Sequence, residues 1–540
     1  MNTDHAYQQS GAFIAHLIKN GFKKHGPAIS RGEFEVHSID LTPIKLNVQH
    51  MVPFVLAKRV SNRETVTPGQ LDQILPDLLS LKQSLQRDIA VLIIGGELIG
   101  DESIVEELGL SGIAVMDRST IESTCANADF VAKSKLLSTP LIRFLGRETL
   151  SPYISGRPAV AGRFFGRLSA VKRILPGGGN WTVLGNRRIG KTSLLQEIRA
   201  RLRMQGVSTC WLYGGKYNST LDAVHDILRE LDQFRIADHV IADPNKAKNL
   251  PSYIHRMADS EKKNIAVFID ELDHILDFDA KQNFELLELL RETFQNHDSC
   301  RIFMAGFRQV MEASRSLNHP LFNFTKPYEL QSLSRDEALE MITKPLSNLG
   351  VDLSGSDLAN AIYRQTAGQP ELIQIHCAEV IKMFEAEGKV PGGPDLFADV
   401  FNTEEYKQKV LGTFLANTNP YEELLCYLLI QDAEESGKIP QYEFGPADVD
   451  RVLKKVGYNI GLRQIMAIIT QLKISGIITP IMGRTEKYKF SVPQFVGYCL
   501  RGNLTFSISK ALEAAKNCSE EFAYWLDPEE VSGSGGKLNA

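Results

Sequence analysis

The sequence has few cysteines, and none stands in an arrangement that carries chemistry. Seven cysteines are scattered over 540 residues, and no two of them form a CxxC pair. Small secreted domains use an even, closely spaced set of cysteines as a disulfide framework, and zinc knuckles need CxxC spacing. The pattern argues against both classes and predicts a protein of the reducing cytoplasm.

A long hydrophobic run is also missing. The apolar stretch Ile89–Ile94 has only the length of a strand, whereas a membrane-spanning helix needs about 20 apolar residues. The N-terminus lacks the charged-then-apolar order of a signal peptide. We expect a short amphipathic helix there and no membrane partner. One face of that helix would carry Phe13, Ile14, Leu17, Ile18 and Phe22.

Positive charge is not in excess, because the formal net charge is -5 at pH 7. The molecule as a whole therefore does not attract nucleic acid, and any DNA binding would depend on a local basic patch. A composition of 43% hydrophobic and 23% charged residues is that of a soluble globular protein. The length is too great for one hydrophobic core, so several domains are expected.

Changes in the pattern of strand-like and helix-like segments along the chain predict the domains. Residues 1–150 alternate strand-like and helix-like segments, which indicates a small α/β domain. Residues 160–335 alternate again, and residues 336–400 are helical, with a break at PGGPD (391–395). Residues 415–505 hold short helices followed by two strand-like runs, the outline of a winged helix. The last residues, SGSGGKLNA (532–540), look like an artificial linker.

The strongest motif is a phosphate-binding loop. The strand-like segment Trp181–Leu184 precedes GNRRIGKTS, and a helix-like segment follows, which is GxxxxGK[ST] in the context it requires. Two glycines let the loop wrap closely, so that backbone amides point at the β-phosphate. The motif therefore predicts an α/β P-loop NTPase with a parallel sheet. Its candidate nucleotide-binding residues are Gly185, Asn186, Arg187, Arg188, Ile189, Gly190, Lys191, Thr192 and Ser193.

The motif also predicts the chemistry. We expect Lys191 to contact the β- and γ-phosphates and the Thr192 hydroxyl to bind Mg²⁺. A second apolar run ends in Asp270 and Glu271. Asp270 would hold the magnesium shell and Glu271 would orient the attacking water. Lys191, Asp270 and Glu271 are thus the catalytic candidates of an ATPase with ATP and Mg²⁺ as cofactors. The guanine-reading NKxD signature is absent, which favours adenine.

A third strand-like run, Arg301–Gly306, lies where such ATPases carry a polar sensor of the γ-phosphate. It leads into Phe307 and Arg308 rather than Asn or Thr. Arg308 has two interpretations, a phosphate-sensing cation and an ordinary surface arginine, and the sequence favours neither.

Over residues 160–505 the sequence resembles the signal-transduction ATPases with numerous domains (STAND), which are close to the AAA+ ATPases. RFFGR (163–167) is similar to the family's hhGR segment near the adenine, which implies roles for Phe165, Gly166 and Arg167. The P-loop, VFIDELD and PYELQSLSRDEALEMI also match the family pattern. TAGQPEL (366–372) resembles the family's GxP element, in which the proline of the lid, here Pro370, approaches the nucleotide.

The resemblance implies a closed ADP state and an opened ATP state, with self-assembly or partner engagement as the output. Such a lid can convert the presence or absence of one γ-phosphate into a rigid-body movement of a domain. Arg364 is a further phosphate-sensing candidate, with an exposed helix arginine as the competing interpretation.

Residues 30–130 resemble the restriction-endonuclease-like PD-(D/E)xK fold in their order of strands and helices. Metal-dependent cleavage needs carboxylates to hold the metal and a lysine to assist the water. The family motif would place an acid two residues before Lys58, but Leu56 stands there, and Asp40 is the only other candidate acid. We expect an inactive nuclease-like domain that binds DNA, a partner or itself. An unrelated α/β domain is the alternative.

The predicted winged helix would present residues 462–473 as its recognition helix. This segment is largely apolar, with Arg463 and Lys473 as its cations, whereas a DNA reader presents several polar side chains to the bases. The wing, residues 483–489, is basic enough to touch phosphates. A packing or regulatory role is favoured over sequence-specific reading.

These features together predict a STAND-type switch that binds ATP and ADP and hydrolyses ATP slowly. Self-association or a protein partner is expected, and DNA is a further candidate partner. Combining the ATPase with a nuclease-like fold suggests bacterial defence against phage or foreign DNA, by association only. The alternatives are an ATP-dependent transcription regulator and a loader or transposition-helper ATPase acting on DNA.

Overall fold

The computed structural model describes residues 12–517, apart from 20–21, 42–43, 45, 48–50, 62, 100–106, 127–129, 160–162, 177, 232, 296, 391–396, 416–417, 440–441 and 482. The break at 391–395 and the tail at 532–540 lie outside these residues. Two compact units divide the chain. The first holds residues 1–166, 335–362 and 373–397, and the second holds 167–334, 363–372 and 398–540. Of the helices in the described part, none combines the length and apolarity needed to span a bilayer.

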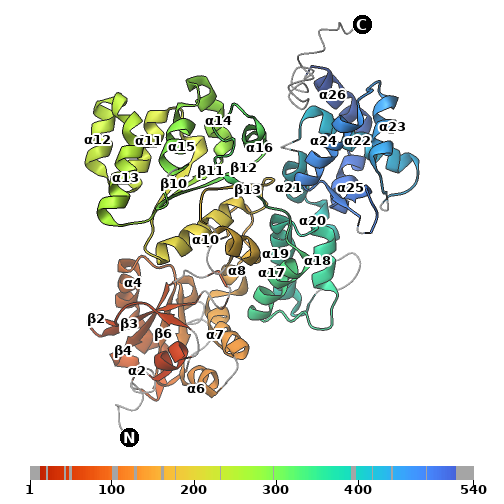
Figure 1. The fold of residues 1–540 in the computed structure, drawn as a ribbon. Helices are drawn as coiled ribbons and strands as arrows, with labels where there is room; N and C mark the ends of the chain where they lie inside the picture. The colour runs from red at the N-terminus through yellow and green to blue at the C-terminus, as the bar shows by residue number, and fades with distance from the viewer. Residues whose placement is uncertain are drawn as a thin grey trace. The chain divides into compact units, whose positions relative to one another are not determined.

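The first unit is built on a six-stranded mixed sheet (Figure 1). Its strands follow the order β1-β3-β4-β6-β8, with β2 also paired to β3. β3 runs antiparallel to β2 and β4, whereas β4, β6 and β8 are parallel. The strands are β1 (Lys23–Lys24), β2 (Ile29–Arg31), β3 (Phe34–Asp40), β4 (Met51–Ala57), β6 (Ala90–Ile93) and β8 (Ile113–Met116), and a separate parallel pair is β5 (Thr65–Val66) and β7 (Glu97–Leu98).

The first unit also contains helices. They are α2 (Lys58–Ser61), α3 (Pro68–Asp72), α4 (Leu75–Ser84), α6 (Arg118–Ala126), α7 (Phe130–Leu145), α8 (Arg147–Leu150), α17 (Arg335–Asn348), and parts of α18 (Leu358–Thr366) and α19 (Pro370–Glu387). The Tyr153 hydroxyl donates to the carbonyls of Met341 and Ile342 at 3.0 and 2.8 Å, which ties α17 to the segment after α8. Residues 12–19 are helical as expected, but Ile18 is 41% exposed while the other four predicted apolar side chains are buried.

The second unit contains a five-stranded parallel sheet in the order β10-β11-β12-β9-β13. Its central strands read as continuous apolar runs because helices cover both faces of a parallel sheet. The strands are β9 (Trp181–Leu184), β10 (Ser208–Tyr213), β11 (Ile265–Asp270), β12 (Cys300–Gly306) and β13 (Lys326–Glu329). The prediction of an α/β fold with a parallel sheet of the P-loop NTPase kind is confirmed.

The two faces of this sheet differ. Trp211, Phe268 and Phe303 stack across three neighbouring strands on one face, with centroid distances of 5.9 and 4.8 Å. The opposite face packs aliphatic side chains against helices in a single core. The helices around the sheet are α9 (Leu168–Ile174), α10 (Lys191–Met204), η3 (Gly214–Lys216), α11 (Thr220–Glu230), α12 (Phe234–Ala242), η4 (Pro244–Asn249), α13 (Leu250–Glu261), α14 (Leu272–Asp279), η5 (Ala280–Gln282), α15 (Glu285–Gln295) and α16 (Arg308–Arg315).

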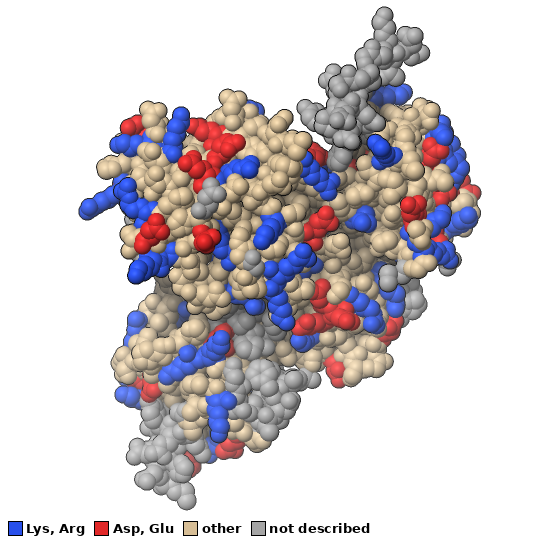
Figure 2. Space-filling view, in the orientation of Figure 1, with Lys and Arg blue, Asp and Glu red and all other residues tan. Residues whose placement is uncertain are grey.

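The C-terminal part of the second unit is a helical module with a short hairpin. We call residues 398–517 the C-terminal module. Its elements are α20 (Ala398–Asn402), α21 (Glu404–Phe414), α22 (Pro420–Glu435), α23 (Pro446–Lys455), α24 (Leu462–Ile474), β14 (Ile478–Pro480), β15 (Tyr488–Phe490), α25 (Pro493–Arg501) and α26 (Leu504–Asn517). β14 and β15 pair antiparallel. Figure 2 shows Lys and Arg interspersed with Asp and Glu over the face in view.

Candidate nucleotide-binding site

The predicted phosphate loop joins the end of β9 to the start of α10. Two residues of the loop have left-handed backbones, Arg188 with φ 60° and Gly190 with φ 100°. A Cβ at Gly185 would lie 2.8 Å from the Leu330 carbonyl oxygen, so the close approach of the two segments requires glycine. Because α10 begins at Lys191, the positive end of its dipole faces the loop.

The Lys191 ammonium lies at the centre of the loop. Its Nζ donates to the carbonyl oxygens of Gly185 at 2.7 Å and Asn186 at 3.0 Å. Burial lowers the pKa of Lys191, and the carboxylates of Asp273, Asp270 and Glu271 oppose that shift, in decreasing order. The lysine is therefore a partly buried cation with acids nearby, suited to receive phosphate oxygens.

Thr192 and Asp270 come from different elements and meet at 2.8 Å, the distance from Thr192 Oγ1 to Asp270 Oδ2. Asp270 ends β11 and is 4% exposed. Burial raises the pKa of Asp270, whereas the Thr192 hydroxyl and the Lys191 charge lower it. A hydroxyl beside a carboxylate is the oxygen donor set that Mg²⁺ prefers. Among the described residues, no cluster of three or more His, Cys, Asp or Glu side chains forms a metal site.

Glu271 and Asp273 follow Asp270 but are placed differently. Glu271 has φ 54° and its carboxylate lies 3.5 Å from Nε2 of His274. Asp273 accepts a hydrogen bond from the Phe307 amide at 2.9 Å, and burial raises its pKa. Sequence reasoning missed Asp273, although VFIDELD shows it three residues after the strand. Asp273 has a stronger electrostatic effect on Lys191 than Glu271 has.

The other residues predicted to bind nucleotide differ in their exposure and in the unit to which they belong. Nη2 of Arg167 donates to the Ile189 carbonyl at 3.1 Å, which ties the hhGR-like segment to the loop. Ile189 and Ser193 are buried, while the side chains of Arg187 and Arg188 are exposed. Phe165 and Gly166 belong to the first unit rather than to the loop's own unit.

The GxP-like turn lies in the second unit. Pro370 is the first residue of α19, and Gly368 has φ 72°. The Gly368 carbonyl accepts from the Leu333 amide at 2.9 Å, and a Cβ at position 368 would lie 2.3 Å from the Leu333 carbonyl oxygen. Arg364 is exposed on α18. The turn is thus fixed to the segment that follows β13.

Asn186 connects the phosphate loop to the C-terminal module. Its carboxamide nitrogen donates to the carbonyls of Thr413, at the end of α21, and Ser475, just after α24, at 3.0 and 2.5 Å. Its carboxamide oxygen accepts from the Arg187 amide at 2.7 Å. Asn186 is 1% exposed, so these hydrogen bonds are made away from water. The sequence predicted a nucleotide contact for Asn186 and gave no sign of these partners.

Arg308 makes an ion pair with Glu422 of α22, which joins the start of α16, after β12, to the C-terminal module. The Glu422 side chain is 1% exposed and that of Arg308 is 18% exposed. Burial raises the pKa of Glu422, and the Arg308 charge opposes that shift. Glu422 also accepts from the Asn419 amide at 3.2 Å. The Arg308 side chain is thus largely covered and paired, and its phosphate-sensing interpretation stays a prediction.

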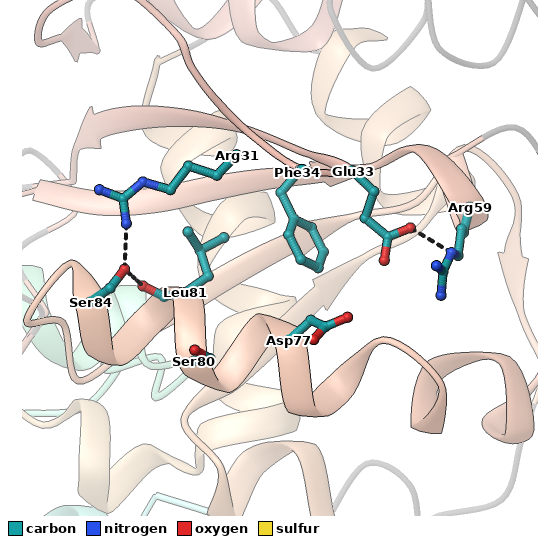
Figure 3. Close-up of a pocket in the computed structure, with 9 residues that line it drawn as sticks. Arg31, Glu33, Phe34, Arg59, Asp77, Ser80, Leu81 and Ser84 are labelled. Carbon is teal, nitrogen blue, oxygen red and sulfur yellow. Dashed lines mark hydrogen bonds and ion pairs between the residues drawn. The ribbon is translucent and has the colours of Figure 1, made fainter.

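A pocket of about 420 Å³ lies in the first unit between the β2–β3 hairpin and α4 (Figure 3). Arg31 donates to Ser84 Oγ at 2.7 Å at one end, and Arg59 pairs with Glu33 at 2.8 Å at the other. The side chains of Phe34 and Leu81 lie between them in Figure 3. The pocket is lined by both cations and carboxylates, so its lining does not carry charge of a single sign.

The two candidate nuclease residues do not meet. Asp40 pairs with Met51 at one end of β3 and β4, whereas Ala57, just before Lys58, pairs with Phe34 at the other end. Six residues of strand correspond to about 20 Å at roughly 3.3 Å per residue. Asp40 and Lys58 therefore do not form a common metal site.

Comparison with known proteins identifies the central domain. Residues 176–312 match the AAA domain family, so this segment is an AAA-type P-loop ATPase domain. A comparison with curated proteins found no significant match.

Solved structures to which the chain is similar include the Walker-type ATPase PABY2304 of Pyrococcus abyssi, at 14% identity, covering 64% of this chain and 99% of that one, with a TM-score of 0.46. The Aeropyrum pernix ORC2 protein in ADPNP–ADP complexes is 14% identical, covering 68% and 98%, with a TM-score of 0.45. Drosophila ORC bound to DNA is 12% identical, covering 63% and 87%, with a TM-score of 0.33.

Proposed function

We propose that the chain is a STAND-type molecular switch that binds ATP with Mg²⁺, hydrolyses the ATP slowly, and changes conformation or assembles when ATP is bound. In this proposal Lys191 and the loop amides hold the phosphates, and Thr192 and Asp270 hold the metal. The bound Mg²⁺ would neutralise charge on the phosphate oxygens. Glu271 orients the water that attacks the γ-phosphate.

The observation that carries the proposal is the pair of hydrogen bonds from Asn186 to Thr413 and Ser475. Asn186 is part of the loop that wraps the phosphates, and its partners belong to the C-terminal module. When the loop amides turn toward phosphate oxygens, the Arg187 amide leaves the Asn186 carboxamide. A rotated carboxamide no longer satisfies the two buried carbonyls, so nucleotide binding favours a different placement of the module.

The Arg308–Glu422 ion pair supports the same coupling from a second point. Arg308 follows β12, which lies between β9 and β11, the two strands that lead into the phosphate loop and the acids. Breaking a buried ion pair is costly unless both charges find new partners. A γ-phosphate near β12 would offer Arg308 such a partner and release Glu422 with the module.

For the C-terminal module we propose a regulatory winged helix. Support comes from the order of α22, α23 and α24 followed by the β14–β15 hairpin. Two of the predicted wing cations are engaged by carboxylates, Arg484 with Glu443 and Lys487 with Asp448 at 3.1 Å. Such pairing reduces the charge available to DNA phosphates, which favours packing over DNA reading.

For residues 1–150 we propose a restriction-endonuclease-like domain that lacks nuclease activity. The antiparallel β2, β3 and β4 followed by α4 and a parallel β6 agree with that fold. The separation of Asp40 from Lys58, with Leu56 in place of an acid, supports inactivity. We also propose that residues 160–335 form the ATPase domain, residues 336–400 a helical lid and residues 415–505 the winged helix.

The cellular role that we propose is a cytoplasmic switch in defence against phage or foreign DNA, with self-association or a protein partner as output. An ATP-dependent DNA-binding protein is the alternative. Size-exclusion chromatography with light scattering separates them, using the full chain with ADP, with ATP, and with ATP plus duplex DNA. A shift in mass or elution with ATP alone supports the switch. A shift only with ATP and DNA together supports the alternative, and an unchanged profile in all samples contradicts both.

A further inference from the structure

The pocket in Figure 3 lies between one face of α4 and the β2–β3 hairpin. Asp77, Leu81 and Ser84 line it from α4 at spacings of four and three residues, which places them on one face of the helix. Arg31 and Phe34 line it from the hairpin. They pair directly across β2 and β3, so their side chains lie on the same face of the sheet. Helical and strand periodicity therefore set both walls of the pocket.

One end of the pocket is suited to an anion. The Ser84 hydroxyl donates to the Leu81 carbonyl at 2.7 Å, and its oxygen accepts from Arg31 Nη1, also at 2.7 Å. This contact fixes the guanidinium with one of its five N–H groups in use. No other hydrogen bond or ion pair joins the Arg31 side chain to the described part of the chain. The remaining N–H groups can hold a carboxylate, which accepts two parallel hydrogen bonds from a guanidinium.

The opposite end carries two carboxylates, Glu33 and Asp77, on the other side of the Phe34 ring in Figure 3. Asp77 is exposed in the first turn of α4 and makes no ion pair with any residue that the structure describes. The Glu33 side chain is 17% exposed, and Arg59 Nε lies 2.8 Å from its Oε2. Because Arg59 balances one of the two carboxylates, this end keeps a net negative charge and is suited to an ammonium group.

An apolar stretch of definite length separates the two ends. Asp77 and Ser84 are seven residues apart on α4, which corresponds to about 10 Å at 1.5 Å per residue. The buried side chains of Phe34 and Leu81 lie between the charged groups in Figure 3. An extended peptide of three residues also spans about 10 Å, at roughly 3.3 Å per residue. The pocket volume of about 420 Å³ is in the range of small-ligand sites.

We propose that this pocket binds a short apolar peptide with free ends, about three residues long. Its terminal carboxylate pairs with Arg31, and its terminal ammonium pairs with Asp77 and Glu33. Its side chains contact Phe34 and Leu81. A ligand with opposite charges at its two ends gives both signs of the lining a partner. The site lies in the first unit, and the proposal does not depend on the ATPase function.

Calorimetric titration of trileucine into the full chain tests the site. We expect one peptide to bind per chain. Acetylating its ammonium or amidating its carboxylate should each weaken binding about threefold to tenfold, as for a partly exposed ion pair. Dileucine is too short to reach both ends and should bind more weakly than trileucine. No binding of trileucine, or equal affinities of trileucine, dileucine and the two blocked forms, overturns the proposal.

Two variants assign the ends, and both change exposed side chains, so the fold should persist. Asp77→Asn should weaken trileucine binding about threefold to tenfold and diminish the effect of acetylation, while amidation keeps its effect. Arg31→Ala should show the reverse. Asp72→Asn on α3 and Arg235→Ala on α12, both exposed, are the matched controls and should bind trileucine as the wild type does. An acetylation effect of full size in Asp77→Asn, or an amidation effect of full size in Arg31→Ala, overturns the proposal.

Discussion

Asn186 and Ser475 are separated by 289 positions in the sequence and joined by a hydrogen bond of 2.5 Å. The donor belongs to the phosphate loop of the AAA-type domain, and the acceptor is a carbonyl that follows α24 in the C-terminal module. Thr413 accepts from the same nitrogen at 3.0 Å. The loop that would bind phosphate therefore also contacts the module whose movement we propose.

The first prediction concerns this contact. Asn186→Ala leaves two buried carbonyls without their donor, which costs about 1–3 kcal/mol for each unsatisfied group. Because the proposed switch gives up this contact when nucleotide binds, its loss destabilises only the nucleotide-free arrangement. We therefore expect Asn186→Ala to bind a fluorescent ADP analogue at least severalfold more tightly than the wild type. Gln205→Ala, which removes an exposed carboxamide just after α10, is the control. Equal affinities of wild type and Asn186→Ala would show that the contact is not coupled to the nucleotide site.

The second prediction concerns the buried ion pair. Glu422→Gln leaves Arg308 without its counter-charge and should lower the free energy of unfolding by about 3 kcal/mol, measured by urea denaturation. Replacing both residues, Arg308→Met with Glu422→Leu, removes both charges and should recover most of that loss. A Glu422→Gln protein as stable as wild type would mean that the pair is too hydrated to hold the module.

The third prediction is a pH dependence within the C-terminal module. Asp432 accepts hydrogen bonds from Arg451 at 2.5 Å and from Tyr442 at 2.7 Å, and Lys455 is 3.3 Å away. The Arg451 hydrogen bond in particular lowers the pKa of Asp432 below its ordinary value. An acid with a lowered pKa in the folded state contributes stability above its unfolded pKa of about 3.9 and loses it as the pH falls.

Thermal unfolding between pH 6 and pH 3 measures this effect. The wild-type module should lose stability as the pH falls through about 4, and Asp432→Asn should be less stable at pH 6 with a flatter profile. Identical slopes in the two proteins would assign the acid sensitivity to other carboxylates, such as Asp448, whose pKa is also lowered.

The fourth prediction separates binding from hydrolysis. Glu271→Gln keeps the shape of the side chain and removes the charge that would polarise the water, so ATP binding should persist. Single-turnover hydrolysis should slow by about a hundredfold, equivalent to roughly 2.7 kcal/mol of barrier. Glu288→Gln, an exposed change on α15, controls for the loss of one negative charge. Hydrolysis at the wild-type rate would move the role to another acid, and Asp273 is the nearest candidate.

Local patterns explain what the sequence could predict. The phosphate loop needs glycines at fixed spacing between a strand and a helix, and Gly185 and Gly190 show the reason in the close Leu330 contact and the positive φ. The meeting of Thr192 with Asp270 follows from parallel strands whose carboxyl ends lie at one edge. These features depend on few residues, so one sequence is enough to predict them.

Features that depend on tertiary pairing could not be predicted. Asn186 bonds to backbone carbonyls, which every residue carries, so nothing in the sequence marks Thr413 or Ser475. Asp40 was a candidate partner of Lys58 because sixteen positions separate it from Leu56, but the antiparallel register of β3 and β4 places Asp40 and Lys58 at opposite ends. Nothing in the sequence marks the buried Glu422 as the partner of Arg308, which is 114 positions away.

The most direct test of the account is calorimetric titration of ATP with Mg²⁺ into the wild-type chain and into Lys191→Ala. The wild type should bind one nucleotide per chain. Lys191→Ala should show no binding, because the loop loses the cation that lies near Asp273, Asp270 and Glu271. Wild-type protein that does not bind ATP, or Lys191→Ala protein that binds it equally well, would contradict the central claim that this loop is the nucleotide site.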